Sequence, residues 1–176
     1  IESYAATSPA EFFAVTSELF FERPDALAGE RPALYEQLKR CLAIAPVTSL
    51  QPPYSLVKPE VGDEILPFCL EQNIGVIAYS PMYSGLLTGS MTRARVESFP
   101  SDDWRRTDDE FQEPRLTRNL ALAELLKSIA AKHGRSAAEA SVAWVLANPA
   151  VTGAIVGARR ASQIDGFIGA VDFTLT

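Results

Sequence analysis

From Pro46 onward, short apolar runs alternate with segments of helical periodicity. Strand candidates lie at 47–51, 74–79 and 154–157, and the run at 74–79 is apolar throughout, as in strands that are covered on both faces. The resulting order is strand, helix, strand, loop, helix, helix, strand, helix. Because parallel neighbours need a long crossover connection, usually a helix, this alternation predicts an α/β fold with parallel strands.

Local signals mark the ends of the expected helices. Ser136-x-x-Glu139 forms a capping box that starts one helix, and Asn148-Pro149 ends it. The helix before it ends at Gly134. Two further helices are expected around 65–73 and from about residue 162, whereas 101–116, with nine charged residues out of sixteen, is expected to form a surface loop.

Residues 1–42 have a different pattern, which predicts two helices. Ser8-Pro9-Ala10-Glu11 has the form of a capping box with proline at the first helical position, and this helix ends before Pro24. A second helix starts at Pro32. The composition shift near residues 42–46 predicts a helical segment at 1–44 and an α/β domain at 45–176.

The length limits what the α/β part can be. A chain of 176 residues can bury one good core, but a complete (β/α)8 barrel typically takes about 250 residues. Three predicted strands are too few to close such a barrel. The chain also begins at Ile1, without methionine or a signal segment, so we expect a processed product or a fragment.

Composition and charge argue against several classes of partner. No stretch approaches the roughly 20 consecutive apolar residues of a membrane span, so no membrane partner is expected. The 16 basic and 22 acidic side chains give a net charge of −6, which argues against nucleic acid as a partner. Cys41 and Cys69 are too few for a disulfide framework and are expected to be buried free thiols, which fits a cytoplasmic location.

Several motifs that carry chemistry are absent. The chain has no G-x-G-x-x-G, no P-loop, no C-x-x-C pair and no H-E-x-x-H. His133 is the only histidine, so a multi-histidine metal site within this chain is impossible, and no metal is expected. At the end of its helix, His133 has a structural interpretation, because a partly charged imidazole suits the helix dipole.

The segments that follow the second and third predicted strands are the candidate binding sites. Residues 79–89 place hydroxyl groups and glycines after a buried strand, where α/β proteins bind ligands. Residues 157–163 combine a strand end, Arg159, Arg160 and a helix N-terminus, an arrangement that favours a phosphate. The alternatives are an ordinary strand-to-helix turn for the first segment and a solvated arginine pair for the second.

Residues 47–176 resemble the C-terminal half of the aldo-keto reductase superfamily. The resemblance covers about 130 residues and rests on five stretches in the family's order: SLQPPYSL at 49–56, GVIAYSP at 75–81, SGLLTG at 84–89, AWVL at 143–146 and AIVGARR at 154–160. It implies a partial (β/α)8 (TIM-type) barrel. It also implies an NADPH-dependent oxidoreductase that acts on small carbonyl substrates and binds its nicotinamide dinucleotide without a Rossmann motif.

The resemblance assigns a cofactor role to eleven positions. Gln51 would hydrogen-bond the nicotinamide carboxamide, and Tyr79 would stack on the nicotinamide ring. Ser80, Pro81, Ser84, Gly85 and Leu86 would follow the pyrophosphate and ribose, Gly157, Ala158 and Arg159 would hold the 2′-phosphate region, and Gln163 would contact adenosine. In one departure, many relatives have Glu-Asn where this chain has Gly166-Phe167, which removes two expected adenine contacts.

The catalytic residues of the family fall outside the matched stretch. The family uses Asp, Tyr, Lys and His, with the tyrosine as general acid, and all four lie on earlier strands. None is present here in family context, and the surroundings of Tyr4, Tyr35 and His133 do not match. The resemblance therefore implies no catalytic residue in this chain, and reduction of a carbonyl substrate needs the missing half.

Residues 1–42 instead resemble the C-terminal part of titration-factor-type zinc metallopeptidases. Glu11 would match the third zinc ligand and Tyr4 a transition-state stabiliser. The H-E-x-x-H of that family is absent, and one carboxylate does not hold zinc. The capping-box role of Glu11 is therefore favoured.

These patterns predict a truncated or chimeric chain that keeps the NADP(H)-binding elements of an aldo-keto reductase. Three alternatives stay open: a non-catalytic module that binds nucleotide or a partner, a non-functional fusion fragment and, most distantly, a zinc metallopeptidase remnant. Because a half barrel leaves strand edges unpaired, two chains could also join edge to edge in a homodimer.

Overall fold

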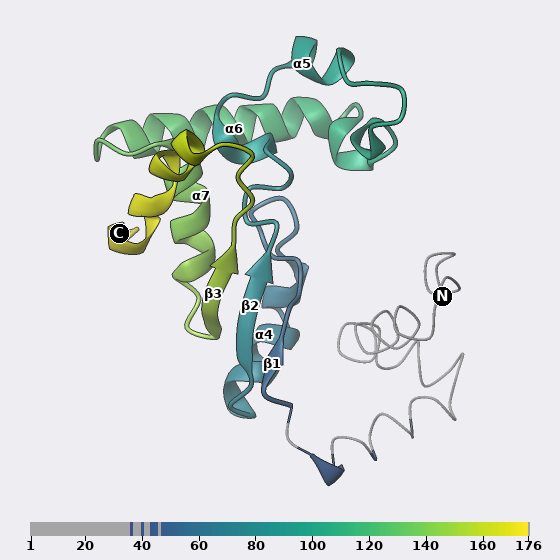
Figure 1. Ribbon diagram of the computed structural model, residues 1–176, viewed down its shortest axis with the longest axis vertical. Helices are drawn as coiled ribbons and strands as arrows, with labels where there is room; N and C mark the ends of the chain where they lie inside the picture. The colour runs from purple at the N-terminus through teal and green to yellow at the C-terminus, as the bar shows by residue number, and fades with distance from the viewer. Residues whose placement is uncertain (1–35, 37–39, 41–42, 46, 176) are drawn as a thin grey trace.

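The computed structural model describes residues 36, 40, 43–45 and 47–175. Within them, a small parallel sheet stands below a long helix that crosses the carboxyl ends of the strands (Figure 1). The helix predicted for residues 9–23 lies outside the described residues. Of the second predicted N-terminal helix, Glu36, Arg40, Ala43 and Ile44 are described, and all four are helical.

The described residues form a three-stranded sheet in the order β1-β2-β3, and all neighbours are parallel. The strands are β1 (Ser49–Leu50), β2 (Gly75–Tyr79) and β3 (Val151–Ile155). Pro53, beyond the end of β1, pairs with Tyr79 in a parallel bridge. The predicted α/β fold with parallel strands is therefore confirmed.

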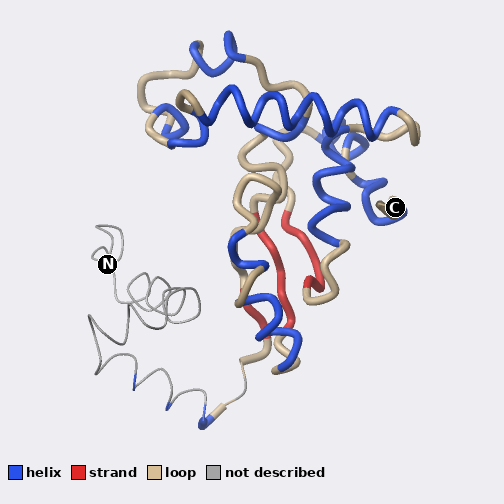
Figure 2. The backbone as a smooth tube through the Cα atoms, turned by 180° about the vertical axis from the view of Figure 1, so that it is seen from behind, coloured by secondary structure: helices blue, strands red, loops and turns tan. Residues whose placement is uncertain are grey.

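Helices cover one face of the sheet. Viewed from behind, α4 (Ile65–Glu71) lies across the strands, and α7 (Ala137–Leu146) runs beside β3 (Figure 2). Val76 and Ala78 of β2 are fully buried in a core that includes Leu66 of α4 and Val145 of α7. The alternate residues of β2 point to the other face, which no described helix covers, and Tyr79 is 37% exposed there.

A second core lies above the sheet. The long helix α6 (Arg115–Ala131) packs there on α7 and on the 3-10 turns η3 (Leu86–Thr88) and η5 (Asp109–Phe111). The buried centre includes Leu86, Leu87 and Phe111. The remaining elements are η2 (Glu60–Gly62), α5 (Arg93–Glu97), η4 (Trp104–Arg106), η6 (Ala161–Gly166) and η7 (Ile168–Asp172).

The capping box that was predicted for α7 is present. The Ser136 hydroxyl accepts from the Glu139 N–H at 2.9 Å, and the Glu139 carboxylate accepts from the Ser136 N–H at 2.7 Å. Cys69 is a free, buried cysteine, as the sequence predicted, and burial raises the pKa of its thiol. Cys41 lies outside the described residues.

Two predicted boundaries are wrong. The third strand runs from Val151 to Ile155, not from 154 to 157, because it starts directly after the turn that ends α7 and pairs with β2 from Val76 onward. The segment at 101–116 is only partly a surface loop. It contains two 3-10 turns, its Phe111 is buried in the upper core, and its last two residues begin α6.

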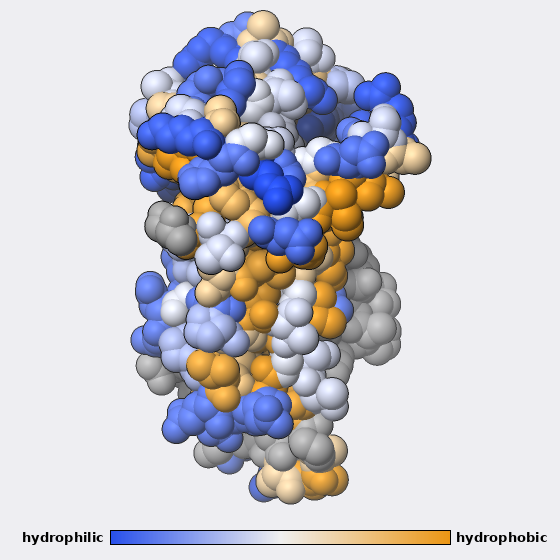
Figure 3. All heavy atoms as spheres, turned by 90° about the vertical axis from the view of Figure 1, so that its left-hand side faces the viewer, coloured by the Kyte–Doolittle hydropathy of each residue, from blue (hydrophilic) through white to orange (hydrophobic). Residues whose placement is uncertain are grey.

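The side of the molecule that carries α7, β3 and the C-terminus shows apolar atoms between polar regions above and below (Figure 3). Exposed apolar residues of the C-terminal part include Ile155, Ile164, Ile168 and Val171.

No helix in the described part of the chain is long and apolar enough to span a membrane.

Candidate functional site

The loop that follows β2 has an unusual backbone. Ser80, Tyr83 and Ser84 have positive φ angles of 53°, 43° and 51°, and Gly85 has a φ of 92°. Residues other than glycine rarely adopt positive φ angles, and those that do are concentrated at functional sites. Glycine is the residue that adopts this conformation without steric cost, so the sequence explains Gly85 but gives no warning of the three neighbours.

Two backbone N–H groups of this loop have no partner among the described residues, whereas their neighbours are hydrogen-bonded. The N–H of Leu86 donates to the Tyr83 carbonyl at 3.0 Å, and that of Tyr83 donates to the Ser80 carbonyl at 2.9 Å. The two successive N–H groups of Ser84 and Gly85 make no hydrogen bond with the described residues. Adjacent free N–H groups in a turn of this kind form a binding place for an anion.

The segment between α5 and α6 holds this loop from outside. The Tyr83 hydroxyl donates to the Asp108 carboxylate, 3.0 Å from Oδ2, and its ring stacks on Phe111 with centroids 6.1 Å apart. Burial and this hydrogen bond raise the pKa of Tyr83 above its ordinary value. Arg105 reaches the same loop, with Nη1 3.5 Å from the Ser84 carbonyl oxygen.

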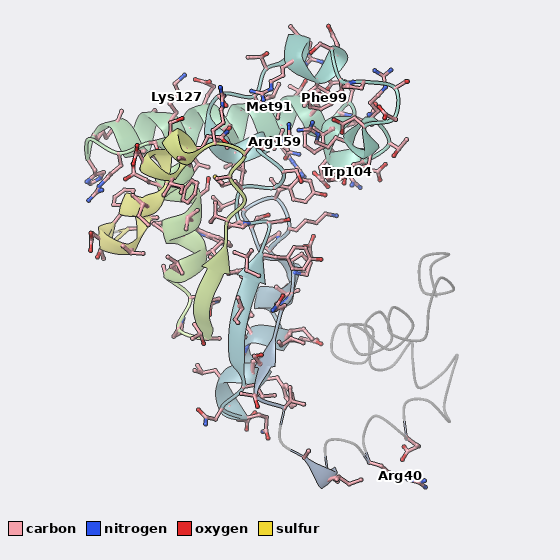
Figure 4. All side chains as sticks on the ribbon, in the orientation of Figure 1. Arg40, Met91, Phe99, Trp104, Lys127 and Arg159 are labelled. Atoms are coloured by element: carbon pink, nitrogen blue, oxygen red, sulfur yellow. The ribbon has the colours of Figure 1, made fainter. Side chains whose placement is uncertain are left out.

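Arg105 is itself fixed in place. It forms a two-point ion pair with Asp103, with Nε 2.9 Å from Oδ1 and Nη2 2.5 Å from Oδ2, and its guanidinium lies 3.8 Å from the centre of the Phe99 ring. The hydrogen bond from Arg105 lowers the pKa of Asp103 to about 2, despite a smaller opposing effect of desolvation. The charge of Arg159, in the turn after β3, lowers the pKa of Asp103 further, and in the view of Figure 4 Arg159 lies on the side of this segment.

The turn after β3 is open to solvent. Gly157, Ala158 and Arg159 are exposed. The side chain of Gln163 folds back over this turn, where its Oε1 accepts from the N–H of Arg159 at 2.7 Å and from that of Arg160 at 3.0 Å. Gln163 therefore shapes the turn that presents Arg159.

Strand order brings most of the predicted cofactor residues together. Tyr79 and Ile155 are register partners at the carboxyl ends of β2 and β3, so the loop at 80–85 and the turn at 157–159 leave the sheet side by side. Gln51 follows β1, on the other side of Tyr79, and is exposed. Pro81 and Leu86 differ from the rest, because both are buried and Leu86 is fully enclosed in the upper core.

Sequence reasoning did not assign Asp103, Arg105 or Asp108 to this site. The dense charge of residues 101–116 was the available signal, but it did not indicate which side chains point inward. The described residues contain no group of three or more His, Cys, Asp and Glu side chains that could hold a metal ion.

Comparisons with known proteins identify two related families. The family model described as "Aldo/keto reductase family" matches residues 27–176, and one described as "Glucose-regulated metallo-peptidase M90" matches residues 1–42. Of this second range, the structure describes Glu36 and Arg40.

Curated relatives are aldo-keto reductases. Aldo-keto reductase YhdN from Bacillus subtilis (strain 168) is 33% identical over 141 residues, which are 80% of this chain and 42% of the relative. A probable aldo-keto reductase 1 from Glycine max is 30% identical over 141 residues, 80% of this chain and 40% of the relative. Aldo-keto reductase yakc [NADP(+)] from Schizosaccharomyces pombe is 29% identical over 144 residues, 79% of this chain and 41% of the relative.

A solved structure shares the fold. The glycerol dehydrogenase from Gluconobacter oxydans aligns with a TM-score of 0.73 and 35% identity, over 80% of this chain and 42% of that one. This chain therefore spans about two fifths of the length of its relatives. Its α/β unit is a partial barrel with parallel strands, and the chain belongs to the aldo/keto reductase family.

Proposed function

We propose that this chain is the nucleotide-binding part of an aldo-keto reductase and that its cofactor is NADP(H). The observation that carries the proposal is the register of Tyr79 with Ile155. This register joins a loop with free backbone donors to a turn with an exposed arginine, at the carboxyl ends of neighbouring parallel strands, where barrel enzymes bind their ligands.

Each part of the site suits one part of the dinucleotide. The exposed ring of Tyr79, with Gln51 beside it, would take the nicotinamide. The N–H groups of Ser84 and Gly85 would donate to the pyrophosphate. Arg159 would pair with the 2′-phosphate, since a guanidinium binds phosphate through two parallel hydrogen bonds.

Among the described residues we assign groups that bind the cofactor, and we assign none the role of acid or base in the reaction. When bound, the cofactor supplies a hydride for a carbonyl carbon, and the family protonates the oxygen with residues that precede the matched stretch. Because the chain spans about two fifths of its relatives' length, we propose that it binds NADPH but does not reduce a carbonyl substrate by itself.

Selectivity between NADPH and NADH tests this site. Arg159→Ala is expected to weaken NADPH binding about tenfold, the loss of one charge-assisted contact, and to leave NADH binding within about twofold. Arg95→Ala, which removes an exposed arginine from α5, is the matched control and should change neither. Fluorescence titration of the reduced nicotinamide measures both affinities. Equal losses for the two nucleotides would contradict the role of Arg159 at the 2′-phosphate.

A further inference from the structure

A cavity of about 590 Å³ lies away from the cofactor loop, between the segment after β1, η5 and the first turns of α6. None of the residues assigned to NADP(H) lines it. Its walls carry both charged and apolar side chains, and its volume lies in the range of small-molecule sites.

Glu110 is the centre of the charged wall. It is 4% exposed, and its Oε1 lies 2.9 Å from Nη1 of Arg115 and 3.8 Å from Nζ of Lys58. Its Oε2 accepts from Nη2 of Arg118 at 3.0 Å and from Nδ2 of Asn119 at 2.8 Å. One buried carboxylate thus holds three cations at the edge of the same cavity.

The cations are in excess over the acids of the lining. The lining carries Lys58, Arg115 and Arg118 against Glu110 and the exposed Glu60, and Nη1 of Arg115 also lies 3.4 Å from Oδ2 of Asp109, which is outside the lining. Donors are also left over. Nη1 of Arg118 and Nη2 of Arg115 donate no hydrogen bond to the described residues.

The other wall is apolar. Val57 is buried, and Leu56 and Leu122 are half-buried, so their side chains offer a surface for the body of an organic molecule. Because Asp109 also pairs with Arg115, the local positive charge is too small to favour a phosphate dianion. Two guanidinium groups with free donors suit a carboxylate.

We propose that this cavity binds a small organic carboxylate, with the carboxylate at Arg118, Arg115 and Lys58 and the apolar body against Leu56, Val57 and Leu122. The proposal concerns a second site and does not depend on NADP(H) binding. In this arrangement Glu110 positions the cations, and the ligand binds to the donors that Glu110 leaves open.

Benzoate is the probe, and benzyl alcohol of similar shape is its neutral counterpart. Calorimetry on the full chain should show one saturable site for benzoate, with benzyl alcohol at least tenfold weaker because it lacks the charge. The same titration with saturating NADPH should give the same benzoate affinity. A failure of NADPH binding would leave this result unchanged, so the two proposals are tested separately.

Variants locate the site. Arg118→Gln and Lys58→Gln should each weaken benzoate binding, Arg118→Gln by about tenfold, whereas Arg95→Gln, an exposed arginine outside the cavity, should not change it. Arg118 and Lys58 are partly exposed, so both variants are expected to fold, which their melting curves would verify. Absent benzoate binding, equal binding of benzyl alcohol, binding of inorganic phosphate alone, or unchanged affinity in both variants would overturn the proposal.

Discussion

Tyr83 connects the loop after β2 with η5, two segments that lie far apart in the sequence. Its hydroxyl bonds Asp108, and its ring packs on Phe111, so the loop after β2 and η5 hold one another. Tyr83→Phe keeps the ring and removes the hydrogen bond. It is expected to lower the free energy of unfolding by about 1–2 kcal/mol, since the acceptor is charged.

A double-mutant cycle in urea with Asp108→Ala checks this expectation. The Asp108 carboxylate also accepts from the Glu110 N–H at 2.8 Å, so Asp108→Ala alone should cost more than Tyr83→Phe. A coupling energy of about 1 kcal/mol is expected between the two positions. Strictly additive losses would contradict a direct interaction.

Asp103 gives a prediction on pH. Its pKa falls from 3.8 to about 2 in the folded chain, chiefly through the hydrogen bond from Arg105. A lowered pKa means that the ionised carboxylate stabilises the fold fully above about pH 4 and loses this effect as the pH falls through 2. The difference in stability between the unmodified chain and Asp103→Asn should therefore be constant from pH 7 to about 5 and shrink below pH 4. Melting curves across this range measure it, and a difference independent of pH would rule out the pair.

Single residues also show how far the sequence can predict this site. The segments at 79–89 and 157–163 were located from their place after a strand, because position along a parallel sheet fixes which loops meet, whereas the roles of Tyr79, Ser84, Gly85 and Arg159 came from the family resemblance and stay predictions. The inward position of Arg105 does not follow, since nothing local distinguishes it from the exposed Arg106. Packing against Phe99 and pairing with Asp103 decide it.

At the scale of elements, the short C-terminal 3-10 helices η6 and η7 pack against the first turn of α7 and the residues just before it. Ser136 donates to the Gly166 carbonyl at 2.6 Å, and Gly169 lies against the ion pair of Arg135 with Glu139. A Cβ at residue 169 would overlap both of these charged side chains.

Gly169→Ala is therefore expected to lower the free energy of unfolding by about 1 kcal/mol, the lower end for overpacking, because the ends of two flexible side chains must move. Gly166→Ala is the matched control, since a Cβ at residue 166 meets nothing within 4 Å. Chemical denaturation compares the two variants. Equal stabilities would show that η7 does not rest on the ion pair as described.

Elements differ in how well the sequence predicts them. α7 was predicted with its capping box, because both ends carry strong local signals, Ser136 with Glu139 at one and Pro149 at the other. The third strand was placed three residues late, because its first residues, Val151, Thr152 and Gly153, carry no clear apolar run. Their pairing with β2, a tertiary contact, decides that they are a strand.

At the scale of the molecule, the sheet has two edges and one face that no other described strand or helix covers. β1 and β3 each pair on one side only among the described residues, and Tyr79 and Ile155 are exposed at the strand ends. In the glycerol dehydrogenase that shares this fold, the matched region is 42% of the chain. The loop at 80–85 and the turn at 157–159, to which our proposal assigns the nucleotide, consist of described residues, so we expect this chain to bind NADPH by itself.

The most direct test of this account is a titration of the unmodified chain with NADPH, followed by nicotinamide fluorescence and by the melting temperature. We predict saturable binding of one NADPH per chain, a rise in melting temperature as the bound state is populated, and no consumption of NADPH when an aldehyde is added. The absence of any binding would contradict the assignment of Tyr79, Ser84, Gly85 and Arg159 to a cofactor site. Consumption of NADPH that depends on the aldehyde would contradict the claim that this chain binds without catalysing.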